Sequence, residues 1–423
     1  MRVLFLTSHL PYPPYSGGRR REFELIRRIG SEIDLTIVAV SKTFDEDLRL
    51  APALYSSCRS VHVFPAQPEP IHGDGTYAGV PAKTWRNMSA QAKGLVHRLL
   101  ASNDVDVVHC EGYFMMPLLP LRHHAQTLIV EQNMDFQLLE QESKLSSDPE
   151  VNHACSLAAD LAFKTAIDCW RRSSACGVLT QEDLDTVRTL APEVWTFLLP
   201  DGFDHTTDLP LGSSNLDFCN DGGSILNTVP PDEPVLLFVA NFAYQPNVDA
   251  AHFLVREILP TVLNENPRTL TILAGNSPTE ELVAYDKRMG VHVTGRVKSL
   301  APFYNRATLV VVPVRIGGGI KVKMLEAFAQ GKACVTTSVG VQGLGGIARN
   351  CVVRDEPSAF ARAVCHYLAD EEGRRKLEEQ ARLATRELFT WQGASDLLLR
   401  SYEELIAAHS RDRVLSASTG TLG

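Results

Sequence analysis

The feature that most constrains this chain is an alternation, found twice, of short β-branched apolar runs with longer stretches of helical periodicity. Such runs are typical of strands buried on both faces of a parallel sheet, so the alternation predicts βαβ units. The first series of runs occupies 2–7, 34–40, 106–110, 127–132 and 175–180; the second reads PVLLFVA, TLTILAG, VHVTG, TLVVVPV and ACVTTS. The sequence therefore predicts an α/β protein with two doubly wound, Rossmann-like parallel sheets.

A polar stretch rich in Gly, Asp and Asn separates the two series, and we interpret residues 206–231 as a linker. This places an N-terminal domain at 1–205 and a second domain at 232–390, which a chain of 423 residues accommodates. Ligands of open α/β sheets bind outside the carboxyl ends of the strands, so we expect a cleft where the two domains face each other. Apolar residues at helical spacing predict a helix over 391–410, and 411–423 is expected to be a flexible tail.

Several protein classes fit this composition poorly. The apolar runs are much shorter than the roughly 20 residues that cross a bilayer, and the apolar start Val3–Leu6 reads as a buried strand rather than a signal peptide. Nine cysteines without a C-x-x-C pair argue against a zinc module or a disulfide framework and favour the reducing cytoplasm. A net charge of −9 argues against nucleic acid as a partner. Peripheral contact with the inner face of the membrane stays open.

The stretch 310–338, VVVPVRIGGGIKVKMLEAFAQGKACVTTS, carries most of the chemistry. A predicted strand ends in three glycines, whose backbone N–H groups can approach an anion closely at the start of a helix. Lys321 and Lys323 add positive charge, and Glu326 offers a carboxylate that can accept hydrogen bonds from vicinal hydroxyls. The alternative is that the glycines only form a tight turn and that both lysines are solvated.

This stretch resembles the donor domain of the family 4 retaining glycosyltransferases, and in particular a subset with the motif PxRxGGGxKxKxLEA. The family carries two glutamates eight residues apart. Glu326 matches the second, whereas Gly318 stands at the place of the first. The resemblance implies the GT-B architecture, a nucleotide-sugar donor whose ribose is held by Glu326, and a C-terminal helix that crosses back to the first domain.

A second segment, 238–254, resembles the first strand and loop of the same donor domain. Family members often carry an Arg and a Lys there for the diphosphate, but this chain has Asn241 and Asn247. We therefore expect Lys321 and Lys323 to supply the charge, with Lys321 in the loop and Lys323 at the helix start, because helical residues two apart lie roughly 200° apart around the axis. A third segment, 291–313, resembles the stretch whose backbone reads the nucleobase, here Gly295, Arg296 and Val297.

In the N-terminal half, PYPPYSGGRRREFEL resembles an acceptor-domain loop in which a glycine pair, here Gly17 and Gly18, lies beneath the donor diphosphate. For Arg19 and Arg21 the alternative is an exposed basic helix face, which we favour over ligand contact. Polar residues also end two predicted strands: His109 and Glu111 end one, and Glu131 and Asn133 end the next. Groups at these positions can face a ligand, although a lone histidine is more often structural.

The expected roles divide into three groups. Catalytic candidates are Lys321, Gly318 and Glu111. Acceptor-side candidates are His109, Glu131, Asn133 and Arg19. Donor contacts are expected from Gly17, Gly18, Asn241, Gly295, Arg296, Val297, Gly317, Gly319, Ile320, Lys323 and Glu326.

The resemblance implies a retaining hexosyltransferase of carbohydrate biosynthesis that moves a sugar from a UDP-, GDP- or dTDP-sugar to an acceptor hydroxyl. No cofactor and no metal is expected, because the sequence has no Asp-x-Asp presented for a divalent ion and the glycine-rich helix start with two lysines can stabilise the departing diphosphate. The acceptor is a glycan, a lipid-linked intermediate or a small molecule, in cell-surface glycan or secondary-metabolite synthesis. Two alternatives remain: a nucleotide-sugar epimerase of the same fold, and a catalytically degenerate partner subunit that binds the nucleotide sugar.

Overall fold

The computed structural model describes residues 1–14, 16–68, 76–77, 79–145, 148–202, 226, 230–388 and 390–419. The chain divides into two compact units: unit 1 comprises Met1–Gly202 with Trp391–Gly423, and unit 2 comprises Phe203–Thr390. The linker predicted over 206–231 lies almost entirely outside the described residues. Within the described ranges, no helix is long and apolar enough to span a bilayer.

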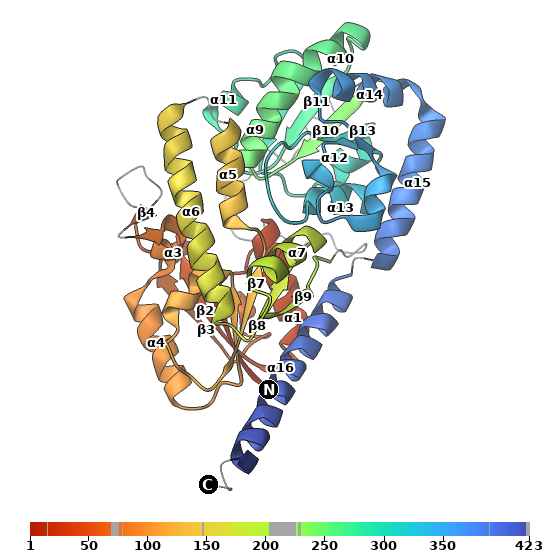
Figure 1. The fold of residues 1–423 in the computed structure, drawn as a ribbon. Helices are drawn as coiled ribbons and strands as arrows, with labels where there is room; N and C mark the ends of the chain where they lie inside the picture. The colour runs from red at the N-terminus through yellow and green to blue at the C-terminus, as the bar shows by residue number, and fades with distance from the viewer. Residues whose placement is uncertain are drawn as a thin grey trace. The chain divides into compact units, whose positions relative to one another are not determined.

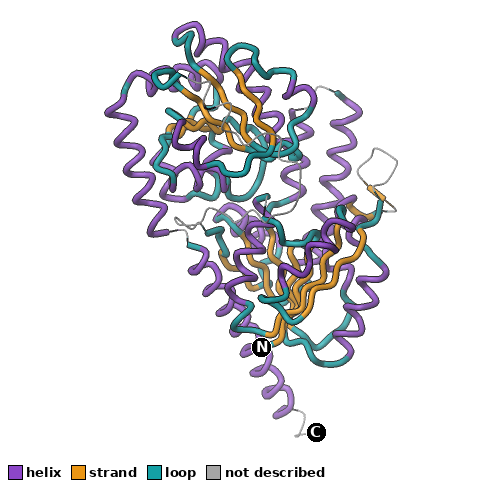
Figure 2. Tube along the Cα trace, turned by 180° about the vertical axis from the view of Figure 1, so that it is seen from behind, coloured by secondary structure: helices purple, strands orange, loops and turns teal. Residues whose placement is uncertain are grey.

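Unit 1 is built on a seven-stranded parallel sheet in the order β3-β2-β1-β6-β7-β8-β9 (Figures 1 and 2). The order reverses between β1 and β6, which is the switch point where ligands of such sheets bind. The five strands predicted in this half are all present. The strands of the sheet are β1 Arg2–Thr7, β2 Asp34–Ser41, β3 Ser60–Pro65, β6 Val107–Glu111, β7 Gln126–Glu131, β8 Ala175–Val178 and β9 Trp195–Leu198; β4 Thr76–Tyr77 and β5 Val80–Pro81 form a separate antiparallel pair.

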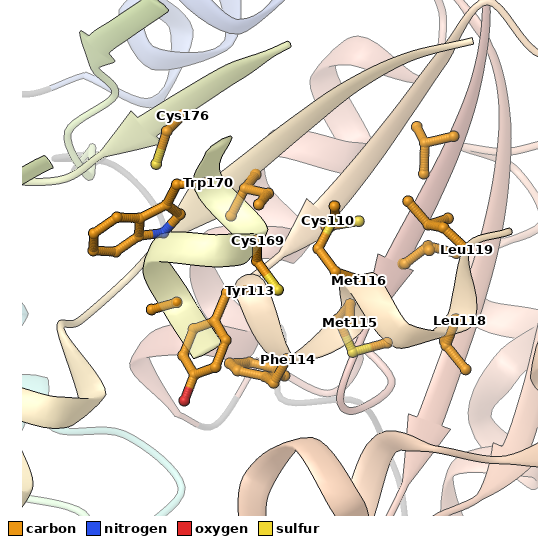
Figure 3. Close-up of a cluster of buried hydrophobic side chains, with 14 of the residues drawn as sticks. Cys110, Tyr113, Phe114, Met115, Met116, Leu118, Leu119, Cys169, Trp170 and Cys176 are labelled. Carbon is orange, nitrogen blue, oxygen red and sulfur yellow. The ribbon is translucent and has the colours of Figure 1, made fainter. Parts of the chain in front are cut away.

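Helices cover the unit 1 sheet, whose central strands are buried along nearly their whole length. Figure 3 shows part of the core, where Tyr113 lies beside Cys169 and Met115 lies beside Met116. The helical segments are α1 Gly17–Ile29, α2 Phe44–Leu50, η1 Ala51–Leu54, α3 Ala82–Asn87, α4 Ala90–Ala101, η2 Tyr113–Leu118, α5 Asp135–Leu145, α6 Pro149–Arg171, α7 Gln181–Leu190 and α16 Trp391–Thr419.

The C-terminal helix α16 packs against α1 and against strands β6 and β7 of unit 1 (Figure 1). It continues to Thr419, so the segment predicted as a tail from 411 is helical over its described part. Trp391, Leu398, Tyr402 and Leu405 of α16 are buried. This apolar face is what fixes the helix to unit 1.

Unit 2 repeats the same plan with six parallel strands in the order β12-β11-β10-β13-β14-β15. Its switch point lies between β10 and β13, and the five strands predicted in this half are again present. The strands are β10 Val235–Val239, β11 Leu270–Ala274, β12 Val291–Gly295, β13 Leu309–Val312, β14 Cys334–Thr336 and β15 Val352–Val353. The helical segments are α9 Gln245–Phe253, the π-helical η3 Leu254–Ile258, α10 Leu259–Glu265, α11 Glu280–Val283, α12 Ala301–Arg306, α13 Val322–Ala329, η4 Val339–Val341, η5 Gly345–Asn350, α14 Pro357–Ala369 and α15 Glu371–Leu388.

Candidate active site

The segment between β13 and α13, residues 313–321, is here called the glycine loop. It leaves the sheet at the unit 2 switch point. Gly317 has φ +136° and Gly319 has φ +62°, backbone conformations that side chains with a Cβ rarely adopt. Gly317, Gly319 and Ile320 are buried, whereas Gly318 is partly exposed. Gly317 and Gly319 are therefore needed for the path of the loop itself, and Gly318 is the glycine that is partly exposed to solvent.

Lys321 holds the glycine loop from within. It is the residue before α13, outside the helix, as the helical geometry predicted. Its ammonium donates to the carbonyl oxygens of Gly318 and Gly319, both at 2.9 Å. The side chain is buried, so the positive charge lies beside the loop backbone and the first turn of α13. That position favours a bound anion.

Lys323 lies in the first turn of α13 and meets the side chain of Asn247 on α9. Its ammonium donates to Asn247 Oδ1 and lies 5.0 Å from the centre of the Phe238 ring. Asn247 in turn donates through Nδ2 to the carbonyl oxygen of Asn241 at 2.8 Å. The structure thus brings the ammonium to the place where the sequence resemblance leaves no basic residue. Burial, together with the charge of Lys321, lowers the pKa of Lys323 to about 7.

The remaining donor candidates of unit 2 lie at or near the carboxyl edge of its sheet. Glu326 is on α13, four residues into the helix, with the Tyr304 hydroxyl 3.5 Å from its Oε2. Gly295 ends β12 with φ +66°, and Arg296 and Val297 follow it. Strands β12 and β13 belong to the same parallel sheet, so the residues after β12 and the glycine loop after β13 leave the sheet at its carboxyl edge. This edge is where a nucleotide would bind in a fold of this type.

In unit 1, the glycine pair and the arginines that follow it differ in exposure. Gly17 is exposed and Gly18 partly exposed at the start of α1. A Cβ on Gly18 would come within 2.9 Å of Gln132 Oε1, so the end of the Gln132 side chain would have to shift to admit a larger residue. Arg19 and Arg21, by contrast, are buried.

The buried arginines correct the expectation of an exposed basic helix face. Arg19 donates to both carboxylate oxygens of Asp47, at 3.0 and 3.1 Å. Arg21 donates to Asp201 at 2.6 Å and to the Leu199 carbonyl at 3.0 Å. Both guanidinium groups thus pair with carboxylates inside unit 1, because a buried charge without a partner is costly. Arg19, expected on the acceptor side, is part of the internal structure.

His109 and Glu111 belong to one buried chain of hydrogen bonds. His109 Nδ1 lies 2.6 Å from the hydroxyl of Tyr402 on α16, and its Nε2 lies 3.0 Å from Glu111 Oε1. Gln132 donates to the other oxygen of Glu111 at 2.9 Å. Burial would raise the pKa of Glu111, but the His109 contact, the Arg21 charge and the Gln132 hydrogen bond outweigh it and hold that pKa below its usual range. Glu111 is therefore a buried carboxylate at the unit 1 switch point.

Glu131 ends β7 and binds groups of the protein itself. Its Oε1 accepts from the Tyr113 backbone N–H at 3.1 Å and from the Trp170 indole N–H at 2.8 Å. Burial raises its pKa to about 8. Asn133 is partly exposed two residues later. The two residues predicted together on the acceptor side thus differ: Glu131 fastens η2 to α6, and Asn133 is at the surface.

Sequence reasoning missed three contacts that shape these regions. Arg315 lies within the recognised motif and is paired with Asp249 on α9, but the motif alone does not show what it meets. Tyr402 sits at ordinary helical spacing, and no signal in the sequence connects it to His109. His9 follows β1, and its Nε2 lies 3.0 Å from Glu22 Oε1, though outside hydrogen-bond geometry. A histidine soon after a predicted strand was the one available signal for this last pair.

The comparison with protein families concerns unit 2. Residues 233–370 match the family model described as glycosyl transferases group 1. The match covers the Asn247 segment, the nucleobase candidates and the whole glycine loop with α13. Among curated sequences, an uncharacterised 44.6 kDa protein in the cps region of Klebsiella pneumoniae is 25% identical over 151 residues. That alignment spans 34% of this chain and 39% of the relative, so the chain matches well under half of the relative's length.

Solved structures resemble the chain over nearly its full length. Sucrose-phosphate synthase from Thermosynechococcus elongatus has a TM-score of 0.70 at 17% identity, covering 96% of this chain and 100% of that one. Anabaena HepE, solved with UDP and glucose, has a TM-score of 0.65 at 13% identity, covering 95% and 99%. WaaG, a glycosyltransferase involved in lipopolysaccharide biosynthesis, has a TM-score of 0.58 at 14% identity, covering 93% and 99%.

These likenesses establish the fold. The chain has the GT-B architecture, with two parallel-sheet α/β units, as the sequence predicted. The fold and the family match of residues 233–370 together support a glycosyltransferase.

Proposed function

We propose that this chain is a retaining glycosyltransferase in which unit 2 binds a nucleoside-diphosphate sugar through the glycine loop and α13. The observation that carries the proposal is the pair Lys321 and Lys323 at the start of α13, within the segment that matches group 1 glycosyltransferases. A donor diphosphate carries about two negative charges, and desolvating them without cationic partners costs several kcal/mol. The two lysines and the helix N-terminus offset that cost without a metal.

The proposed reaction takes place on the leaving-group face of the sugar. The acceptor oxygen forms a bond to the anomeric carbon while the bond from that carbon to the diphosphate oxygen breaks. The diphosphate leaves with the electron pair, and one of its oxygens takes the proton of the acceptor hydroxyl. Gly318 has no side chain that could form a covalent intermediate, which favours this direct transfer. Lys321 stabilises the charge that develops on the leaving group.

The substrates are proposed from the same residues and from related proteins. Glu326 is assigned to the donor ribose, and Gly295 with the two residues after it to the base. HepE is solved with UDP-glucose, which makes a UDP-sugar the first donor to test. Unit 1, with Gly17, Gly18 and Glu111, is proposed to serve the acceptor. The role of WaaG in lipopolysaccharide biosynthesis favours a cell-surface glycan intermediate as acceptor and a cytoplasmic enzyme.

The test begins with ligand binding. UDP, GDP, dTDP and ADP are compared by thermal shift, where a ligand at 100 times its dissociation constant stabilises by about 2.7 kcal/mol. The nucleotide sugars of the best base are then incubated with the protein, with and without EDTA. Release of nucleoside diphosphate that survives EDTA, with retained configuration in the product by NMR, supports the proposal.

Other outcomes favour the alternatives. An epimerised donor identifies an epimerase, and tight binding without turnover identifies a degenerate partner subunit. Turnover that is lost in EDTA and restored by magnesium or manganese refutes metal independence.

A further inference from the structure

The glycine loop is fastened to α9 at its start by Arg315, two residues before Gly317. Arg315 Nε donates to Asp249 Oδ2 at 3.0 Å, and Nη2 donates to Asp249 Oδ1 at 2.6 Å. The planar guanidinium matches the carboxylate with two parallel hydrogen bonds, a geometry that lysine cannot reproduce. The two side chains are 33% and 20% exposed. Two parallel hydrogen bonds between partly buried side chains should make this pair stronger than an ordinary surface ion pair.

Two further side chains on the same helical stretch hold the guanidinium in place. Arg315 lies 4.5 Å from the centre of the Phe253 ring, and its Nη1 lies 3.7 Å from Glu257 Oε1. Asp249, Phe253 and Glu257 are four residues apart along α9 and the π-helical η3, so they succeed one another on one face. Arg315 is thus enclosed by a carboxylate, an aromatic ring and a second carboxylate.

The first turn of α13, which follows the glycine loop, is fastened to the same helix. Lys323 bonds Asn247, which lies two residues before Asp249 on α9. Arg315 and Lys323 therefore flank the three glycines, one on each side, and both attach to the first part of α9. Lys321 fixes the middle of the loop through its two carbonyl contacts.

These attachments bear on binding because glycines lose the most conformational freedom when they are ordered. Ordering one residue costs roughly 1–2 kcal/mol. A loop that must be ordered by its ligand binds more weakly than one already in the bound conformation. The attachments at Arg315 and Lys323 remove much of that cost before any ligand arrives.

We propose that Arg315 is a positioning residue for the donor diphosphate, which acts by keeping the glycine loop in its binding conformation while staying bound to Asp249. The inference rests on the proposed donor site of unit 2. It differs from a direct contact, in which Arg315 would leave Asp249 and bind the phosphates itself. It also differs from a purely structural role, in which the pair would stabilise unit 2 without affecting the ligand.

The experiment compares Arg315→Gln, Arg315→Lys, Asp249→Asn and the double variant R315Q/D249N. The matched control is Arg256→Gln. Arg256 lies on η3 next to Glu257, but its side chain donates to the Tyr285 hydroxyl and not to the partners of Arg315. Calorimetry measures the dissociation constants of UDP and of uridine for each protein, or of GDP and guanosine if the wild type prefers that base. Circular dichroism and thermal melting verify folding.

If Arg315 positions the loop, Arg315→Gln and Asp249→Asn should each raise the dissociation constant of UDP roughly tenfold. The dissociation constant of uridine should change less than about twofold. Arg315→Lys should recover only part of the affinity, the double variant should be no weaker than either single one, and Arg256→Gln should match the wild type.

Three results overturn the inference. If Asp249→Asn leaves UDP affinity unchanged or tightens it while Arg315→Gln weakens it, Arg315 is a direct ligand. If both variants lower the melting temperature without changing the ratio of UDP to uridine affinity, the pair is purely structural. If the wild type binds none of the nucleoside diphosphates, the proposed donor site itself is wrong.

Discussion

The lysine that meets Asn247 leads to a measurable pH dependence of donor binding. Lys323 faces the charged Lys321 just before α13 and the carboxylate of Glu326 on the same helix. Across from it lie the uncharged Asn247 and the Phe238 ring. Burial and Lys321 lower its pKa to about 7, with Glu326 only partly opposing them. The free protein therefore carries a largely neutral amine at this position above pH 7.

The direction of the pH dependence follows from the protonation state of Lys323 that the ligand favours. A diphosphate binds the ammonium form, so the pKa of Lys323 rises on binding and the complex takes up a proton. Below pH 7 the amine is already protonated and affinity is nearly constant. Above pH 7 the amine must first be protonated, which costs about 1.36 kcal/mol per pH unit. The dissociation constant should therefore rise about fivefold between pH 7 and pH 8, because half of the amine is already neutral at pH 7, and about tenfold for each pH unit beyond.

The assay is calorimetry between pH 6 and 8.5 with the nucleotide sugar that binds best, since its diester diphosphate keeps the same charge over this range. Repeating the titration in buffers of different ionisation enthalpy counts the protons taken up. Lys323→Arg keeps a permanent charge and should bind without this pH dependence. Lys323→Met should bind weakly at every pH. If wild type and Lys323→Arg show the same pH profile, Lys323 does not contact the diphosphate.

Two further substitutions test Glu326 on α13 and Glu131 at the end of β7. Glu326→Gln removes a charged acceptor for the ribose hydroxyls and should weaken nucleoside and nucleotide alike by about 1–2 kcal/mol, roughly tenfold, in calorimetry; unchanged affinity would remove Glu326 from the site. Glu131→Gln tests the buried carboxyl whose pKa is raised to about 8 in the folded protein. Because the fold favours the neutral acid, the free energy of unfolding of the wild type is highest below the pKa of the unfolded chain. It falls as the pH rises from that value towards 8. Urea unfolding should then show the Gln variant gaining several kcal/mol over the wild type between pH 5 and pH 8.5. An equal difference at both pH values would mean that Glu131 is ionised throughout.

The central strands of both sheets were predictable because they are buried on both faces. β1 and β7, like β10 and β13, contain continuous apolar runs in the sequence. The edge strands β3, β9 and β15 were not predicted. β3 and β9 are only partly buried and β15 has two residues, so none produces a long apolar run. The glycine loop was recognisable for a related reason, since Gly317 and Gly319 adopt backbone conformations that other residues avoid.

The features that the residues alone predict are therefore local: the central strands, the glycine loop, and the placement of Lys321 before α13 with Lys323 inside it. Tertiary structure alone decided which charged side chains meet. Arg21 pairs with Asp201 across 180 positions of the chain, His109 meets Tyr402 across 293, and Lys323 meets Asn247 across 76. Periodicity reports which face of an element is buried, but a buried charge is stabilised only by the partner that another element brings to it. For that reason a run of arginines that reads as a solvated surface in the sequence is buried in the fold.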